Sequence, residues 1–171
     1  MERKGIITFK GNGLTLDGPE IKVGDTAPDF TCLDQALKPV KLSNFKGQTV
    51  VISVVPSLDT PVCEIQTKKF NQEATGLNAK ILTISMDLPF AQKRFCDAFN
   101  IQNVVVLSDY KDHDFANKYG LLIKELGLLS RAVLVIGKNG KIDYTEIVKE
   151  VTLEPNYKAA LEKVKSTVGI A

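Results

Sequence analysis

The chain has 171 residues, of which 44% are hydrophobic and 25% charged, with a net charge of +2. We expect a single globular domain over residues 1–171, and the interspersed charges give nucleic acid no basic patch to bind. No apolar run approaches the roughly 20 residues of a membrane span, and residues 1–24 lack the apolar segment of a secretory signal. We therefore expect a cytoplasmic protein that binds neither nucleic acid nor membranes.

The N-terminal part alternates short apolar segments with turn residues. Residues 5–16 predict a β-hairpin with a turn at residues 11–13, the segment Gly-Asn-Gly. Residues 18–28 contain two glycines and two prolines and predict a connector. Short strands are expected at residues 29–33 and 40–42.

The middle of the chain alternates predicted strands and helices. The β-branched segment 48–55 predicts a buried strand, followed by a helix from Pro61 with Val62, Ile65 and Phe70 at helical spacing. Two further strands are expected at residues 80–85 and 104–107, and two further helices at residues 89–99 and 112–119.

The C-terminal part predicts a hairpin and a helix. Residues 132–137 and 141–148 pair around a tight turn at Lys138-Asn139-Gly140. Pro155 opens the terminal helix, with one apolar stripe formed by Tyr157, Leu161, Val164 and Val168. Strand–helix–strand units followed by a hairpin and a helix indicate an α/β fold, with a mixed central sheet and helices on both faces.

One cysteine follows the first core strand in a position that favours reactivity. Thr60 is a suitable N-cap and Pro61 fits the first helical position, so Cys63 is the third residue of its helix. Its sulfur would lie near unpaired backbone N–H groups and the positive end of the helix dipole, which favours the reactive thiolate. The alternative is a structural cysteine, since free cysteines are often buried packing residues.

The segment PSLDTPVC around this cysteine resembles the active-site signature of the peroxiredoxins, which are thiol-dependent peroxidases. With ISMDLPFAQKRFC and LLSRAVLVI, it is similar to the bacterial thiol peroxidases, the atypical two-cysteine peroxiredoxins, over nearly the whole chain. The resemblance implies a thioredoxin-like fold with an N-terminal β-hairpin extension. It also implies a homodimer that reduces hydrogen peroxide and, by preference, organic hydroperoxides, is re-reduced by thioredoxin, and needs no metal, haem or flavin.

In this resemblance Cys63 is the peroxidatic cysteine, which peroxide oxidises to a sulfenic acid. The matching arginine, Arg131, belongs to the catalytic set, and its guanidinium fork can donate to the sulfur and to a peroxide oxygen together. From position alone, an arginine with its head group in water is the more common arrangement. Thr60 can cap the helix, and the resemblance adds a hydrogen bond to the peroxide. Pro56 ends the preceding strand and is expected to shield the site from water.

The other two cysteines receive different interpretations. Cys96 lies on the helix opened by Pro89, and its neighbours alone indicate a packing role on a mostly buried stripe of Phe90, Arg94, Phe95 and Phe99. The resemblance of DLPFAQKRFC to the thiol peroxidase segment makes Cys96 the resolving cysteine, which forms an intramolecular disulfide with Cys63. Cys32 matches no catalytic position, and we expect it to be buried on the strand face that it shares with Phe30.

Two other functions remain open. A one-cysteine peroxidase would use an external thiol to resolve Cys63, with Cys96 structural. A redox sensor or thiol-regulated binding protein would use the same reactive cysteine without catalysis. His113, the only histidine, has no motif that ties it to Cys63, so we expect a surface residue rather than part of a Cys–His hydrolase. The absence of Cys-x-x-Cys disfavours a thioredoxin-type oxidoreductase.

Overall fold

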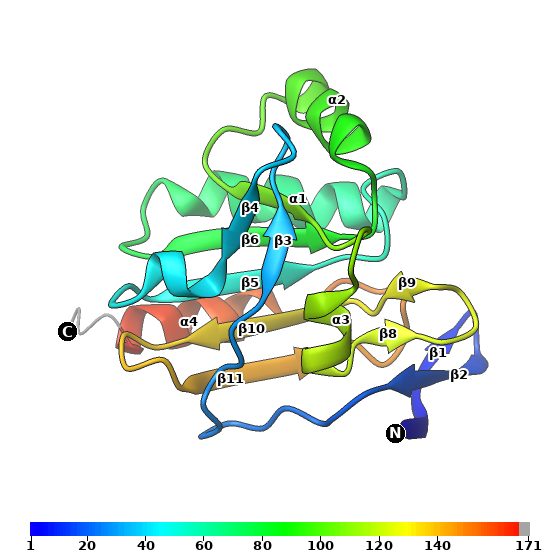
Figure 1. Cartoon of the computed structure of the whole chain (residues 1–171). Helices are drawn as coiled ribbons and strands as arrows, with labels where there is room; N and C mark the ends of the chain where they lie inside the picture. Colours follow the sequence, from blue (N-terminus) through cyan, green and yellow to red (C-terminus); the bar gives the residue numbers. More distant parts are fainter. Residues whose placement is uncertain (168–171) are drawn as a thin grey trace.

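We describe a computed structural model of the chain over residues 1–167 (Figure 1). Within these residues, the strands of the central sheet are β3 (Thr31–Leu33), β4 (Pro39–Lys41), β5 (Val50–Val54), β6 (Lys80–Ser85), β7 (Val105–Ser108), β10 (Ala132–Ile136) and β11 (Ile142–Ile147). Their order across the sheet is β11-β10-β5-β6-β7-β3-β4. A smaller sheet comprises β1 (Glu2–Phe9), β2 (Asn12–Asp17), β8 (Leu122–Ile123) and β9 (Leu128–Leu129), in the order β1-β2-β8-β9.

Helices complete the described part of the chain. They are the short 3₁₀ helix η1 (Leu42–Phe45) and the α-helices α1 (Pro61–Ala74), α2 (Pro89–Phe99), α3 (Asp114–Tyr119) and α4 (Tyr157–Thr167). No helix within residues 1–167 is both long and apolar enough to cross a membrane.

The central sheet is mixed, as the sequence predicts. β5, β6 and β7 run parallel to one another. β10 lies antiparallel to β5, β11 antiparallel to β10, and β3 antiparallel to β7. Strands covered on both faces are continuous apolar runs. Every residue of β5 and of β10 is buried, which explains their β-branched sequences and places them at the centre of the molecule.

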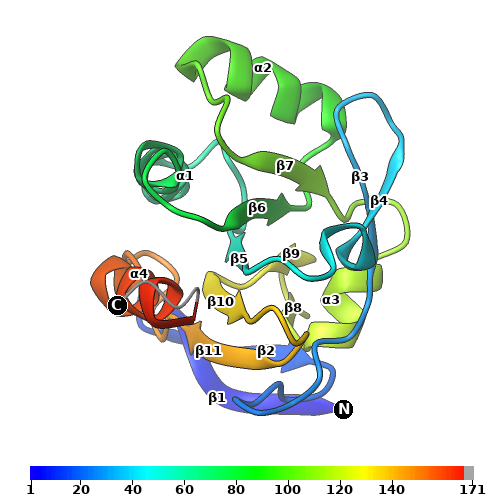
Figure 2. The ribbon, with the colours of Figure 1, turned by 90° about the vertical axis from the view of Figure 1, so that its left-hand side faces the viewer.

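Helices cover both faces of this sheet, because alternate strand residues point in opposite directions. On one face, Val51 and Val133 pack against Phe70 of α1 and Val164 of α4. On the other face, the cluster that contains Ile52 includes residues of α3. Figure 2 shows α1 and α4 together on one side of the sheet and α3 on the other. The layered α/β architecture predicted from the sequence is confirmed.

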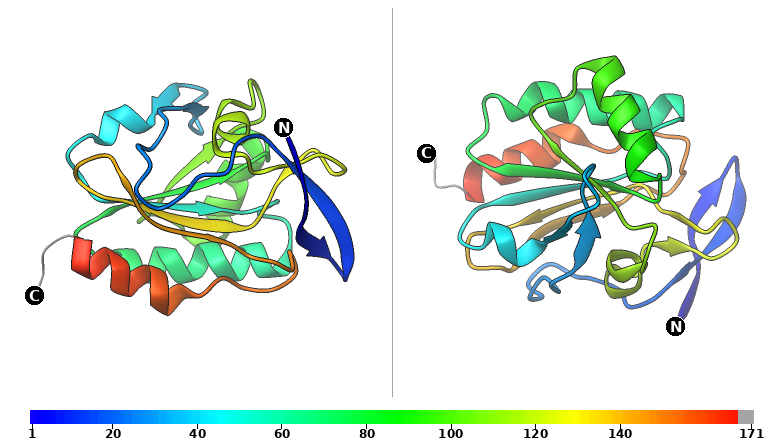
Figure 3. Two further views of the ribbon diagram at one scale, coloured as in Figure 1. Left: turned by 90° about the horizontal axis from the view of Figure 1, so that it is seen from below. Right: turned by 45° about the horizontal axis from the view of Figure 1, so that its top comes forward.

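The N-terminal hairpin is present, but its predicted turn is wrong by about two residues. β1 and β2 pair as far as Phe9 and Asn12, so the turn residues are Lys10 and Gly11. Both have positive φ, 50° and 82°, which a two-residue hairpin turn of type I′ requires. Figure 3 shows this hairpin at one end of the molecule, on the side of β8 and β9.

Other differences concern the ends of elements. α4 begins at Tyr157, two residues after the predicted Pro155, and Val168 of the predicted stripe lies outside the described residues. α3 begins at Asp114 rather than at residue 112, because His113 has a left-handed backbone with φ 53° and stands before the helix. The sequence does not predict β8 and β9, since strands of two residues carry no periodicity.

Candidate active site

The loop after β5 places Cys63 in the first turn of α1. Thr60 has the extended backbone of an N-cap, with φ −109° and ψ 148°, and Pro61 occupies the first helical position. Cys63 is therefore the third helical residue, as predicted. The predicted capping bond of Thr60 is wrong: its hydroxyl donates to the carbonyl of Ser57 at 3.0 Å and does not accept from the helix. The backbone N–H of Thr60 points to the same carbonyl at 3.3 Å, so a tight turn directs the hydroxyl backwards.

The buried face of α1 carries polar as well as apolar residues. Its buried residues are Cys63, Gln66, Thr67 and Phe70, at the spacing of one helix face. Ile65, one of the three apolar residues at helical spacing, is 49% exposed. The polar side chains take inward positions because each has a partner: Thr67 donates to the Cys63 carbonyl at 2.9 Å, and Gln66 donates to Ser53 Oγ at 2.9 Å.

Arg131 meets Cys63 inside the protein. Arg131 stands directly before β10 and is 2% exposed, while Cys63 is fully buried. Nη2 of Arg131 donates to Cys63 Sγ at 3.2 Å. The alternative of an arginine with its head group in water is therefore wrong for this position. The contact places a fixed positive charge beside the buried sulfur.

Neutral acceptors hold the other nitrogens of Arg131. Nε donates to the Val151 carbonyl at 2.9 Å, and Nη1 donates to Gln66 Oε1 at 2.9 Å. Within residues 1–167 no carboxylate forms an ion pair with this guanidinium. A buried cation is costly without a counter-charge. Within the described residues, the Cys63 sulfur is the ionisable group that contacts this guanidinium.

The N-terminal hairpin contacts the segment whose Val151 carbonyl accepts from Arg131. Thr8 in β1 accepts from the N–H of Val151 at 2.9 Å, and Val151 packs with Ile7 and Leu16 of the hairpin. Glu150 accepts from the N–H of Gly11 at 2.9 Å and so fixes the hairpin turn. The segment whose carbonyl holds Arg131 is thus fastened to the hairpin extension.

Cys96 lies on α2, close to the same site. It is 7% exposed, and it belongs to one apolar cluster with Cys63, Leu58 and Phe95. Burial raises the pKa of the Cys96 thiol, while a hydrogen bond from Gln35 Nε2, 3.3 Å from the sulfur, acts to lower it. Both cysteines are free thiols in this structure.

The buried face of α2 differs from the predicted stripe. Phe95 is buried as expected, whereas Phe90 is 66% exposed and Phe99 39%. Arg94 is exposed too, and Gln92 and Cys96 point inward instead. Gln92 is buried because its Nε2 donates to the Leu107 carbonyl at 2.8 Å.

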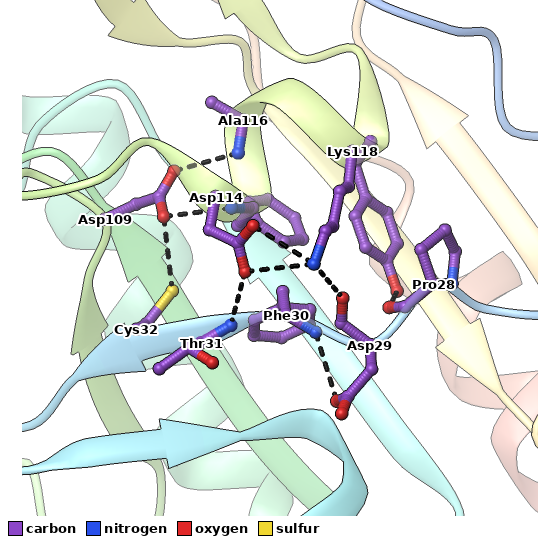
Figure 4. Close-up of polar contacts among 11 residues, drawn as sticks. Pro28, Asp29, Phe30, Thr31, Cys32, Asp109, Asp114, Ala116 and Lys118 are labelled. Carbon is purple, nitrogen blue, oxygen red and sulfur yellow. Dashed lines mark hydrogen bonds and ion pairs between the residues drawn. The ribbon is translucent and has the colours of Figure 1, made fainter.

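The remaining residues of interest occupy different places. Pro56 is buried two residues after the end of β5, at the start of the loop that leads to Cys63. Cys32 is buried as predicted, and its thiol donates to Asp109 Oδ1 at 3.5 Å (Figure 4). Burial, reinforced by Asp109, raises the pKa of Cys32 far above its ordinary value, so this thiol stays protonated. His113 stands half-buried before α3, across the sheet from α1, and is not brought to Cys63.

Sequence reasoning missed Gln66, Val151 and Gln35. Gln66 carried one usable signal, since it follows Cys63 by three positions and so shares its helix face. Val151 contributes only a backbone carbonyl, and Gln35 contacts a cysteine 61 positions away. Neither contact leaves a local pattern in the sequence.

Comparison with known proteins identifies the family of the chain. The family described as Redoxin matches residues 22–161. The thiol peroxidase of Oceanobacillus iheyensis is 58% identical over 156 residues, 91% of this chain and 95% of that protein. That of Bacillus subtilis is 50% identical over 163 residues, 95% of this chain and 98% of that protein.

Solved structures with a similar fold are also peroxiredoxin-like proteins and thiol peroxidases. A peroxiredoxin-like protein from Aquifex aeolicus superposes with a TM-score of 0.90 at 48% identity, over 96% of this chain and 99% of that one. A thiol peroxidase from Chromobacterium violaceum shares the fold, with a TM-score of 0.86 at 19% identity, over 96% of this chain and 98% of that one. The molecule is thus a redoxin with the thioredoxin-like fold of the peroxiredoxins. Within that class, the chain belongs to the thiol peroxidase family, and it is a peroxidase.

Proposed function

We propose that this protein reduces hydroperoxides with Cys63 as the peroxidatic cysteine, Cys96 as the resolving cysteine and thioredoxin as the reductant. The observation that carries the proposal is the buried contact of 3.2 Å between Arg131 Nη2 and Cys63 Sγ. The nucleophile of such a reaction is a thiolate, which needs a stabilising charge at the sulfur. The burial of both groups strengthens that interaction, because water does not screen it.

In the first step, the Cys63 thiolate attacks one peroxide oxygen and the O–O bond breaks. The leaving oxygen takes up a proton and departs as water or an alcohol, and the sulfur becomes a sulfenic acid. A guanidinium has five N–H groups. Within the described residues Val151, Gln66 and Cys63 accept three of those in Arg131, which leaves two for a peroxide oxygen on which charge develops.

Thr60 and Pro56 have supporting roles in this step. The Thr60 hydroxyl can turn from the Ser57 carbonyl, which it contacts at 3.0 Å, to the peroxide and hold it in line with the sulfur. Pro56, buried at the base of the loop, keeps water from the sulfur.

In the second step, the Cys96 thiolate attacks the sulfenic sulfur of Cys63. An S–S bond forms, and the hydroxide that leaves takes up a proton to become water. The two thiols of thioredoxin then reduce this disulfide and become oxidised themselves. Both sulfurs are buried, and both belong to the same apolar cluster.

A preference for organic hydroperoxides follows from the apolar residues around the Cys63 loop. Leu58 is buried beside Cys63, while Val62 is half-buried and Leu88 is 51% exposed. An alkyl group that covers the exposed parts of Val62 and Leu88 gains about 0.8 kcal/mol per buried CH₂, whereas hydrogen peroxide gains nothing. Equal second-order rate constants for cumene hydroperoxide and hydrogen peroxide would rule this preference out.

Burial of Cys96 favours one second candidate, the one-cysteine peroxidase. Because burial raises the pKa of the Cys96 thiol, little of its thiolate is present at neutral pH. The variant Cys96→Ser separates the two candidates. With thioredoxin and its reductase, we expect this variant to consume one equivalent of peroxide and stop. Full turnover by Cys96→Ser would remove Cys96 from the mechanism.

Two further variants complete this experiment. Cys63→Ser should consume no peroxide above the buffer background, since the hydroxyl group of serine cannot replace a thiolate as the nucleophile at neutral pH. Cys32→Ser is the matched control and should turn over like the parent protein, because the Cys32 thiol is protonated and contacts Asp109. We also propose a homodimer located in the cytoplasm, where a catalytic disulfide is transient. Sedimentation of the reduced protein tests the dimer.

A further inference from the structure

Asp87 connects the loop before Cys63 to the start of α2. It lies between β6 and α2, two residues before Pro89, the first residue of that helix. Its Oδ1 accepts from Ser57 Oγ at 2.7 Å, and its Oδ2 accepts from the backbone N–H of Leu58 at 2.7 Å. Hydrogen bonds to a charged carboxylate are shorter and stronger than those between neutral groups. The Cys63 loop is thus bonded to the segment that leads into the Cys96 helix.

The other side of Asp87 is bonded to the sheet and to α2 itself. Ser85 Oγ, at the end of β6, donates to Asp87 Oδ2 at 2.8 Å. Ser108 Oγ, at the end of β7, donates to the Asp87 carbonyl at 2.5 Å. Gln92, on the inward face of α2, donates from Nε2 to Ser85 Oγ at 3.1 Å. Asp87 is therefore the junction between the Cys63 loop, two strand ends and α2.

We propose that Asp87 is a positioning residue that keeps the Cys63 loop and the first part of α2 closed, so that the two segments open together. This inference rests on the proposed function, in which Cys63 and Cys96 become linked. A disulfide needs Cα atoms within about 7 Å, and packed helices are about 8–10 Å apart between axes. The closed arrangement suits the attack on peroxide, and the open one suits disulfide formation.

Opposite effects on the two chemical steps follow from this role. Weaker contacts at Asp87 leave the loop less ordered, so the reaction of Cys63 with peroxide becomes slower. The same change makes opening easier, so formation of the disulfide from the sulfenic acid becomes faster. A variant that merely destabilised the fold would not slow one step and accelerate the other.

The first test is amide exchange of the reduced protein without peroxide. Asp87→Asn is nearly the same size but removes the negative charge, and because its Nδ2 cannot accept a hydrogen bond, only one of the two positions that face Ser57 and Leu58 keeps an acceptor. We expect amide exchange about tenfold faster over residues 57–67 and 89–96 together, from the loss of a charge-assisted contact. Asp59→Asn makes the same chemical change on the exposed part of the same loop and should leave both segments unchanged.

A milder variant and a kinetic readout complete the test. Ser57→Ala removes only the contact to Oδ1 and should accelerate exchange in both segments by a smaller factor. With one equivalent of peroxide, Asp87→Asn should oxidise Cys63 more slowly and form the disulfide faster than the parent protein. Unchanged exchange, faster exchange in only one segment, or an equal fall in both rates would overturn the proposal.

Exchange in the absence of peroxide does not depend on which cysteine resolves Cys63. If Cys63 and Cys96 fail to link while exchange increases in both segments, the role of Asp87 stands and the proposed function fails. If they link while exchange is unchanged, the proposed function stands and the role of Asp87 is overturned.

Discussion

Arg131 and Cys63 lie 68 positions apart in the chain, yet Nη2 of the arginine is 3.2 Å from the cysteine sulfur, inside the protein. The loop after β5 brings the sulfur to this point, and the residue before β10 brings the guanidinium. Because β5 and β10 are neighbours in the sheet, with Val54 paired to Ala132, both groups are placed by the most buried part of the fold. The sheet therefore sets the positions from which the Cys63 loop and Arg131 reach this contact.

Replacing Arg131 by lysine should slow the reaction with peroxide by about 10²-fold, the usual effect of removing one donor that stabilises a transition state. An ammonium group keeps the charge but cannot contact Cys63, Gln66 and Val151 at the same time. Stopped-flow measurement of Cys63 oxidation checks this result. Arg94→Lys, on the exposed face of α2, is the control and should react normally. A normal rate in Arg131→Lys would make Arg131 a structural residue.

Two substitutions of Gln66 should have graded effects on the reactivity of Cys63. Gln66→Leu leaves one nitrogen of Arg131 without its acceptor, and we expect alkylation of Cys63 at neutral pH to slow several-fold. Gln66→Glu supplies a carboxylate that pairs with Arg131 and competes with the thiolate, so the loss should be larger. The rate of iodoacetamide labelling at Cys63 gives the order. Equal rates in the glutamate and leucine variants would contradict the electrostatic account.

Gln35→Leu should raise the pKa of Cys96 further. Burial is the main cause of the raised pKa in the parent protein, and the Gln35 hydrogen bond opposes it. The charges that act on this thiol come from Asp97, which raises its pKa, and Lys93, which lowers it. The variant leaves both charges in place. Alkylation of Cys96 as a function of pH, in Cys63→Ser protein, measures the shift, and a lower pKa in the leucine variant would contradict the contact.

Stability at low pH should depend on Glu150. Hydrogen bonds from the Thr152 hydroxyl and from backbone N–H groups of Gly11 and Thr152 lower the pKa of Glu150 below its ordinary value of 4.5. Since the pKa is lowered on folding, this stabilisation is present above pH 4.5 and is lost as the pH falls further. Glu150→Gln should therefore show a smaller fall in its thermal midpoint between pH 7 and pH 3 than the parent protein. An equal fall in the two proteins would show that Glu150 is not a cause of the lower stability at low pH.

The sequence predicts local features of the structure well, because neighbouring residues determine them. Thr60 and Pro61 determine where α1 starts and so where Cys63 lies, and the sequences of β6 and α2 determine their bounds. The hairpin turn is different. The Gly-Asn-Gly segment allows more than one register. In the observed register the turn is Lys10-Gly11, and the backbone N–H groups of both residues donate hydrogen bonds to Glu150, which is far away in the sequence.

Long-range partners account for what the sequence does not predict. The inward positions of Gln66 and Gln92 follow from Ser53 and Leu107, which lie on strands, and from Arg131, which stands directly before β10. A helix pattern considered alone assigns such polar residues to the surface, and the predicted stripe of α2 places Phe90 wrongly in the core. In the same way, the position of Arg131 before an apolar strand does not reveal whether its head group is buried.

The most direct test of the mechanism is peptide mapping after one equivalent of peroxide is added to the reduced protein. Digestion without reduction, followed by mass spectrometry, identifies which cysteines are linked. The account predicts one main product, a single chain with Cys63 joined to Cys96 and Cys32 still a free thiol. A main product in which two chains are joined, or in which Cys63 is oxidised and Cys96 remains free, would contradict it.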